Sequence, residues 1–216
     1  MRGGRRSAQD GLALAELLVA ALLGTIATTA TVQFFTVQMA ALRVETSRTT
    51  AQLTARTALD LIVRHLEHVG RDPQHGLFSN LDNAALPPAI AAAGATSIHY
   101  RTNLSIDPND NDTIDAWEDV TFSHASGTIW MTQGAGTPAP LTSEDKRRSY
   151  VPTSGLAFAY YDGDGDPVTS LATAAARARV RRISISVTVV GGPEAVSDPH
   201  MPRVTVSQDV FLRNLS

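Results

Sequence analysis

Hydrophobic residues are concentrated at the start of the chain. The run Leu12–Leu42 contains no Lys, Arg or Asp and a single acidic residue, Glu16. Its most apolar part, residues 12–32, would form a helix about 30 Å long, which matches the hydrocarbon core of a bilayer. The pattern therefore predicts a helix that spans a membrane. The positive-inside rule orients the chain so that the basic residues before the helix stay cytoplasmic; these are Arg2, Arg5 and Arg6.

The pattern then changes to a helical period with one apolar face. Between residues 44 and 69, apolar side chains recur at spacings of three and four, which predicts an amphipathic helix. Gly70 is the expected stop, with Pro73 behind it. With the apolar run this makes one helix of about 55 residues, longer than ordinary globular helices. The predicted apolar stripe is Ala51, Ala55, Ala58, Leu59, Ile62, Leu66 and Val69.

From residue 97 onward the apolar period is two, which is typical of half-buried strands. Residues 71–95 are rich in Pro and Ala with several turn residues, so we expect a loop there, and Gly127 marks a hairpin turn. A helix followed by strands indicates an α+β fold, in which the long N-terminal helix packs on a C-terminal antiparallel sheet. The expected strands are 97–101, 119–123, 127–132, 156–161, 183–189 and 203–212.

Net charge, cysteine content and missing motifs argue against several classes of function. A formal net charge of −3 in 216 residues argues against a nucleic-acid binder, which usually carries a basic face. The absence of cysteine excludes disulfides, thiolate metal sites and thiol catalysis. The sequence contains no phosphate-binding glycine loop, zinc-protease motif or serine-hydrolase motif. We therefore predict that the protein is not an enzyme.

Two ordinary explanations of the apolar run fit poorly. A cleaved secretory signal would be shorter, would lack the acid near its start, and would be followed by a small-residue cleavage site. A plain signal anchor leaves Glu16 unexplained, because a carboxylate in the bilayer centre costs about 2.5–3.5 kcal/mol. An acid in such a position indicates a functional role.

The segment around Gly11 resembles the prepilin-type leader of type IV pilins and pseudopilins. A short basic leader precedes Gly11, an apolar Leu12 follows, and Glu16 is the fifth residue after the glycine; G-LALAELLVA is similar to the common form G-FTLIELLVA. The resemblance implies that prepilin peptidase cuts between Gly11 and Leu12 and methylates the new Leu12 amine. It also implies that Glu16 pairs with the Leu12 amine of a neighbouring subunit, and pairing lowers the cost of both charges in an apolar setting.

The remainder of the chain resembles the PilW-like minor pilins and the J-class pseudopilins of type II secretion. Residues 54–73 look like the end of the stem helix in that group, and "GLAFAYYDGDGD … VRRISISVTVV … VFLRN" follows its order in the last third. The resemblance implies a pilin-like architecture. Its parts would be a leader at 1–11, a transmembrane stem helix at 12–42, an amphipathic stem helix at 43–70 and a globular β head at 71–216.

We therefore predict a minor pilin or pseudopilin that is held in the bacterial inner membrane, with its leader cytoplasmic and its head periplasmic or extracellular. It would then join a complex at the pilus or pseudopilus tip and help to initiate type IV pilus assembly. Its partners would be prepilin peptidase, other minor and major pilins and the membrane, with no nucleic acid. Two alternatives stay open: a type II secretion pseudopilin of the J class, and a membrane-anchored calcium-binding adhesin.

An acidic loop at residues 107–118 is the clearest metal-site candidate. Its oxygen-bearing residues follow the spacing of the twelve-residue calcium loop, although Asp112 stands where that loop has glycine. The alternative is a solvated loop of Asx turns. The candidate Ca²⁺ ligands are Asp107, Asn109, Asn111, Thr113, Asp115 and Glu118.

Three further features have simpler interpretations. The second acidic segment, Asp162–Asp166, lacks a bidentate acid and is expected to be a glycine-rich hairpin turn between strands. The basic run Lys146–Arg148 is expected to be solvated. The histidines His65, His68 and His75 lack a clear metal partner and are expected to be solvated, the first two on an exposed helix face.

Overall fold

The computed structural model describes residues 6–72, 78, 88–104, 114–145, 149–192 and 201–215, with side chains from residue 14 onward. The chain forms two compact units, Met1–Glu45 and Thr46–Ser216. The boundary lies inside the first helix, α1 (Arg6–Leu66). The predicted long helix is therefore confirmed. Its outer part, residues 46–66, belongs to the same compact unit as the strands.

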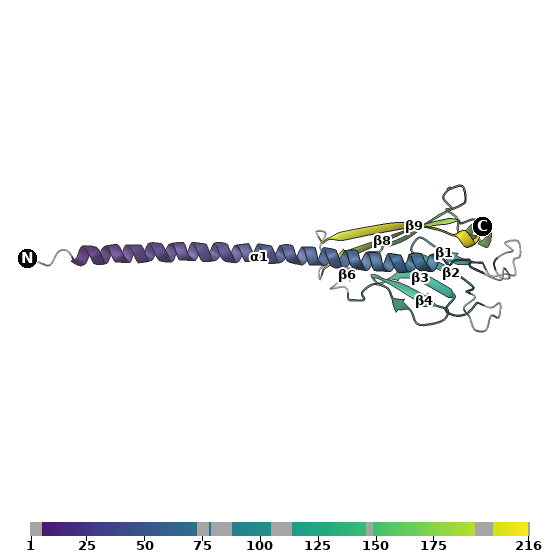
Figure 1. Cartoon of the computed structure of the whole chain (residues 1–216), viewed down its shortest axis with the longest axis horizontal. Helices are drawn as coiled ribbons and strands as arrows, with labels where there is room; N and C mark the ends of the chain where they lie inside the picture. Colours follow the sequence, from purple (N-terminus) through teal and green to yellow (C-terminus); the bar gives the residue numbers. More distant parts are fainter. Residues whose placement is uncertain are drawn as a thin grey trace, which may run out of the picture. The chain divides into compact units, whose positions relative to one another are not determined.

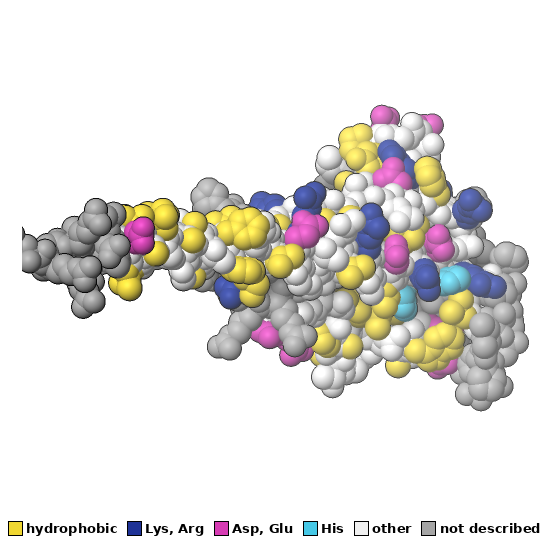
Figure 2. All heavy atoms as spheres, turned by 60° about the vertical axis from the view of Figure 1, so that its left-hand side comes forward, with side chains coloured by type: hydrophobic (Ala, Val, Ile, Leu, Met, Phe, Trp, Pro, Cys, Tyr) yellow, Lys and Arg dark blue, Asp and Glu magenta, His cyan; other side chains and the backbone are white. Residues whose placement is uncertain are grey.

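In the first unit, α1 presents apolar side chains in every direction. Every side chain described between residues 14 and 45 is exposed. The large apolar ones are 52–68% exposed, and Figure 2 shows hydrophobic atoms along the visible face of the helix. Within this unit, no described side chain of the helix is covered.

In the second unit, α1 buries one stripe and ends in a tight turn. All seven residues of the predicted stripe are at most 5% exposed. The helix ends at Leu66, and residues 67–70 tighten into a turn that finishes at Gly70, whose φ of +68° favours glycine. A Cβ at Gly70 would lie 2.2 Å from a side-chain carbon of Leu215. The amide of Asn214 caps this end by donating to the carbonyls of Glu67 and Val69, at 3.1 and 3.2 Å.

The described strands form two antiparallel sheets rather than the one that we predicted. The first sheet is a meander in the order β1-β2-β3-β4-β5. Ser126 and Gly127, both with positive φ, make the predicted turn between β3 and β4. The strands are β1 (Ile90–Ala93), β2 (Ser97–Arg101), β3 (Asp119–Ala125), β4 (Thr128–Gln133) and β5 (Ala139–Pro140).

In the second sheet, β8 is central and pairs with β6, β7 and β9. The predicted alternation along β8 is confirmed, because Ile183, Ile185, Val187 and Val189 are fully buried. A Cβ at Gly191 would lie 2.2 Å from the Ser47 carbonyl oxygen, so glycine lets β8 approach the helix backbone. The strands are β6 (Ser149–Tyr150), β7 (Leu156–Tyr161), β8 (Arg182–Gly191) and β9 (Arg203–Phe211); two short helices are α2 (Ala174–Ala178) and η1 (Arg213–Leu215).

The second unit is an α+β fold in which the outer part of α1 packs on antiparallel sheets. In the view of Figure 1, β8 and β9 lie on one side of this helical segment and β3 and β4 on the other. One hydrophobic cluster joins the buried helix stripe to the inner residues of both sheets. The core therefore lies where the helix meets the strands.

Candidate functional site

The apolar part of α1 is the first candidate. Among the described residues, one helix is long and apolar enough to cross a membrane, and none of its apolar window is buried. This exposure distinguishes it from the core helix of a globular domain. The apolar run is therefore available for lipid or for other subunits.

Five threonines in the apolar part of α1 have hydroxyl groups that already donate a hydrogen bond. Each hydroxyl donates to a backbone carbonyl three or four residues earlier, at 2.7–2.8 Å. Such bonds let a polar side chain enter an apolar medium without a water partner. The residues are Thr25, Thr28, Thr29, Thr31 and Thr36.

Glu16 is the one acidic residue of the apolar run Leu12–Leu42 and is exposed. Within the described part of the chain, no residue forms an ion pair or hydrogen bond with its side chain. The backbone of Gly11 and Leu12 belongs to α1, and the Leu12 side chain lies outside the described ones. Cleavage after Gly11, methylation of Leu12 and the intersubunit role of Glu16 stay predictions.

The candidate calcium loop is described only in part. Asp107, Asn109, Asn111 and Thr113 lie outside the described residues, whereas Asp115 and Glu118 are described. Glu118 is fully buried, and its two carboxylate oxygens accept the backbone N–H groups of Leu104 (2.5 Å) and Asp115 (3.0 Å). The Glu118 carboxylate thus links Leu104, which precedes the segment 105–113, to Asp115, which follows it. The described residues contain no group of three or more His, Asp or Glu that could hold a metal ion.

The second acidic segment forms the predicted turn. Asp162 accepts the N–H groups of Asp164 (3.2 Å) and Asp166 (3.0 Å) and pairs with the Arg179 guanidinium (2.9 Å). Desolvation raises the pKa of Asp162, but these amides and Arg179 outweigh it and hold the pKa below its usual value. The strands do not form a tight hairpin, because α2 lies between β7 and β8. Sequence patterns did not indicate α2, which is only five residues long.

The prediction that His65 lies on a solvated face is wrong. Its ring is partly buried, packs edge-on against Phe122 (5.6 Å between centroids) and places Nδ1 2.9 Å from the Tyr100 hydroxyl. Burial, with a contribution from His68, lowers the pKa of His65 below its ordinary value of 6.5. His68 is exposed as expected, whereas His75 and the basic run Lys146–Arg148 lie outside the described residues.

Comparison with solved structures finds a likeness in fold. No family model matches the chain, and no curated protein matches it. A solved structure of a type IV-like pilin from Thermus thermophilus is similar to 77% of this chain, over 95% of its own length, with 12% sequence identity and a TM-score of 0.46. At these values the likeness carries no weight for function, which rests on the chain's own residues.

Proposed function

We propose that this protein is a minor pilin or pseudopilin, made as a membrane-held precursor that prepilin peptidase cleaves and methylates. One observation carries the proposal. Glu16 is the sole acid in Leu12–Leu42, it is the fifth residue after Gly11, and it lies in the part of α1, residues 14–45, whose described side chains are all exposed. An unpaired acid in a lipid-sized apolar helix needs a partner. The Leu12 amine of a neighbouring subunit, created by cleavage, would supply the positive charge.

The proposed task is to help initiate assembly of a type IV pilus. Before assembly the apolar helix would hold the protein in the bacterial inner membrane, with the leader cytoplasmic and the β unit outside the cytoplasm. After cleavage the exposed stem would pack against the stems of other minor and major pilins at the fibre tip. The alternative is the same role in a type II secretion pseudopilus.

Processing can be tested with two matched glycine variants, each co-expressed with prepilin peptidase. Gly11→Ala is expected to abolish cleavage. Gly24→Ala makes the same exchange farther along the helix and should leave cleavage intact, because an added Cβ there has no atom within 4 Å outside the neighbouring helix backbone. Electrophoretic mobility reads out the loss of the leader. Equal processing of both variants, or of neither, would contradict the proposed leader.

Calcium binding by the 107–118 loop is the second proposal, and it would support the membrane-anchored adhesin. A bound Ca²⁺ would raise the melting temperature of the full chain through linkage. Asp107→Ala should abolish that calcium-dependent rise and leave the melting temperature in chelator unchanged. An equal rise in the variant would exclude this loop as the site.

A further inference from the structure

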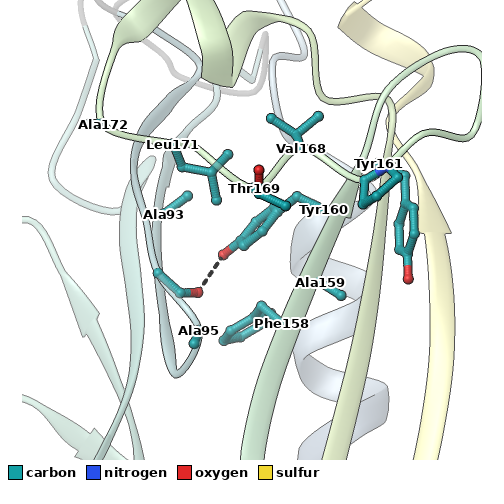
Figure 3. Close-up of a pocket in the computed structure, with 12 residues that line it drawn as sticks. Ala93, Ala95, Phe158, Ala159, Tyr160, Tyr161, Val168, Thr169, Leu171 and Ala172 are labelled. Atoms are coloured by element: carbon teal, nitrogen blue, oxygen red, sulfur yellow. Dashed lines mark hydrogen bonds between the residues drawn. The ribbon is translucent and has the colours of Figure 1, made fainter.

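A groove follows the outer edge of β7 and has an uncharged lining. Its volume is about 570 Å³, and its walls come from Ala93–Ala95, from Phe158–Tyr161 of β7 and from the segment 167–172. In Figure 3 the Tyr160 ring reaches across to the opposite wall, where its hydroxyl donates to the Gly94 carbonyl at 3.0 Å. A charged ligand would lose its hydration there without gaining a charged partner, so the lining favours an apolar, uncharged one.

The strand edge in this groove offers one main-chain acceptor and one main-chain donor. Phe158 and Tyr160 direct their backbone groups away from β8: the Phe158 N–H donates to the Ala95 carbonyl, and the Tyr160 carbonyl accepts from the Val168 N–H, both at 2.8 Å. The Phe158 carbonyl and the Tyr160 N–H point the same way and lie between these two contacts. Among the described residues, neither group has a partner.

These two groups match a peptide residue that runs parallel to β7. In a parallel ladder, one residue donates its N–H to the carbonyl of residue i−1 and accepts from the N–H of residue i+1. Phe158 and Tyr160 are those two neighbours of Ala159. An antiparallel partner would need both backbone groups of a single residue, and each residue already uses one of its groups on Ala95 or Val168.

We propose that the groove along β7 binds a segment of a partner protein that runs parallel to β7 over a single residue, which is apolar and uncharged and in register with Ala159. Main-chain pairing would hold the segment, and the apolar walls would select its side chains. Addition of a strand to a sheet edge is a general mode of peptide recognition. The inference does not depend on cleavage at Gly11, so the two proposals can fail separately.

The test uses the full chain in lipid nanodiscs, labelled with ¹⁵N only at tyrosine. The probe is N-acetyl-leucine methylamide. It contains one residue, which is what fits on the edge of β7 between the hydrogen bonds to Ala95 and Val168. We expect a saturable change in the Tyr160 amide signal with that of Tyr100 unmoved. The chain has four tyrosines, so the spectrum has four backbone signals, and Tyr160→Phe assigns the one that is lost: Tyr100, Tyr150, Tyr160 and Tyr161.

Two changes separate the proposed geometry from general apolar binding. N-methylation of the leucine nitrogen removes the donor to the Phe158 carbonyl and should weaken binding about tenfold. Ala172→Leu fills the groove from an exposed position and should abolish binding, whereas Ala175→Leu, on the exposed side of α2 and outside the groove, should leave it unchanged.

Three results would overturn the proposal. The Tyr160 signal could stay fixed at the solubility limit of the probe. The N-methylated probe could bind as well as the parent, or 1-hexanol could move the signal equally, which would show a site for any apolar molecule. The unchanged Tyr100 signal reports that each variant is folded.

Discussion

Residues 14–45 and residues 46–66 both belong to α1, yet their apolar side chains have opposite surroundings. In the first unit the described leucines and the isoleucine are more than half exposed, and in the second unit one stripe is almost fully buried against two sheets. The helical backbone is continuous, so the difference comes from the side-chain pattern. An all-round apolar surface has to be covered by lipid or other subunits, whereas a striped surface is covered by the protein's own strands.

The largest expected difference between the two regions concerns a pair of isoleucines in α1. Ile62 is fully buried and Ile26 is 58% exposed. Ile62→Ala should lower the free energy of unfolding of the second unit by about 2–5 kcal/mol, and Ile26→Ala should change it by less than about 0.5 kcal/mol. Denaturation followed by tryptophan fluorescence measures this, because both tryptophans, Trp117 and Trp130, are in the second unit. Equal effects would show that the two parts of α1 are packed alike.

Two glutamates extend the comparison to carboxylates. Glu118 accepts two backbone amides in the core, so Glu118→Gln should lower the free energy of unfolding by about 2 kcal/mol. Glu16→Gln should leave that free energy unchanged and instead abolish incorporation into fibres, measured by shearing and immunoblotting. Glu45→Gln, at the end of the first unit, is the matched control for incorporation. A fibre that accepts Glu16→Gln normally would remove the proposed role of this residue.

Two glycines should respond to alanine with opposite signs. Gly70 has positive φ and an added Cβ would meet Leu215, so Gly70→Ala should destabilise the second unit by about 1–3 kcal/mol. Gly24 is in an open stretch of helix, where alanine is preferred by about 1 kcal/mol. Thermal melts of the full chain, followed by circular dichroism, distinguish them. A loss of stability in Gly24→Ala would mean that this part of the helix is packed.

The smallest expected effect is a pH dependence from His65. Its pKa is lowered in the folded state, so the unfolded chain binds more protons below about pH 6.5. Stability is therefore complete above pH 6.5 and falls as the pH decreases toward the lowered pKa. His65→Gln should flatten this dependence between pH 7.5 and 5.5, and His68→Gln should retain it. A slope that persists in His65→Gln would assign the effect to another group.

Much of the fold follows from the sequence, because periodicity directly reports which side chains are covered. The helix stripe from Ala51 to Val69 and the alternation along β8 were both predictable in this way. The division into two sheets was not, because it depends on which strands pair, and pairing involves residues far apart in the chain. The short elements β5, β6 and α2 have too few residues to show a period.

The sequence could likewise predict some features of the candidate sites and not others. The prepilin-type leader is a local sequence motif, so the chain alone could suggest Gly11, Leu12 and Glu16. The role of Glu118 as an anchor for the two sides of residues 105–113 could not be predicted, because one of its partners is the backbone N–H of Leu104, fourteen residues away. The environment of His65 likewise depends on Tyr100 and Phe122, which belong to strands.

The proposed function requires that the apolar helix belongs to a cleaved and methylated precursor. The most direct measurement is the intact mass and N-terminal sequence of the full protein, isolated from membranes of cells that contain prepilin peptidase. A chain that begins at methylated Leu12 is the predicted result. A chain that still begins at Met1 under those conditions would contradict it.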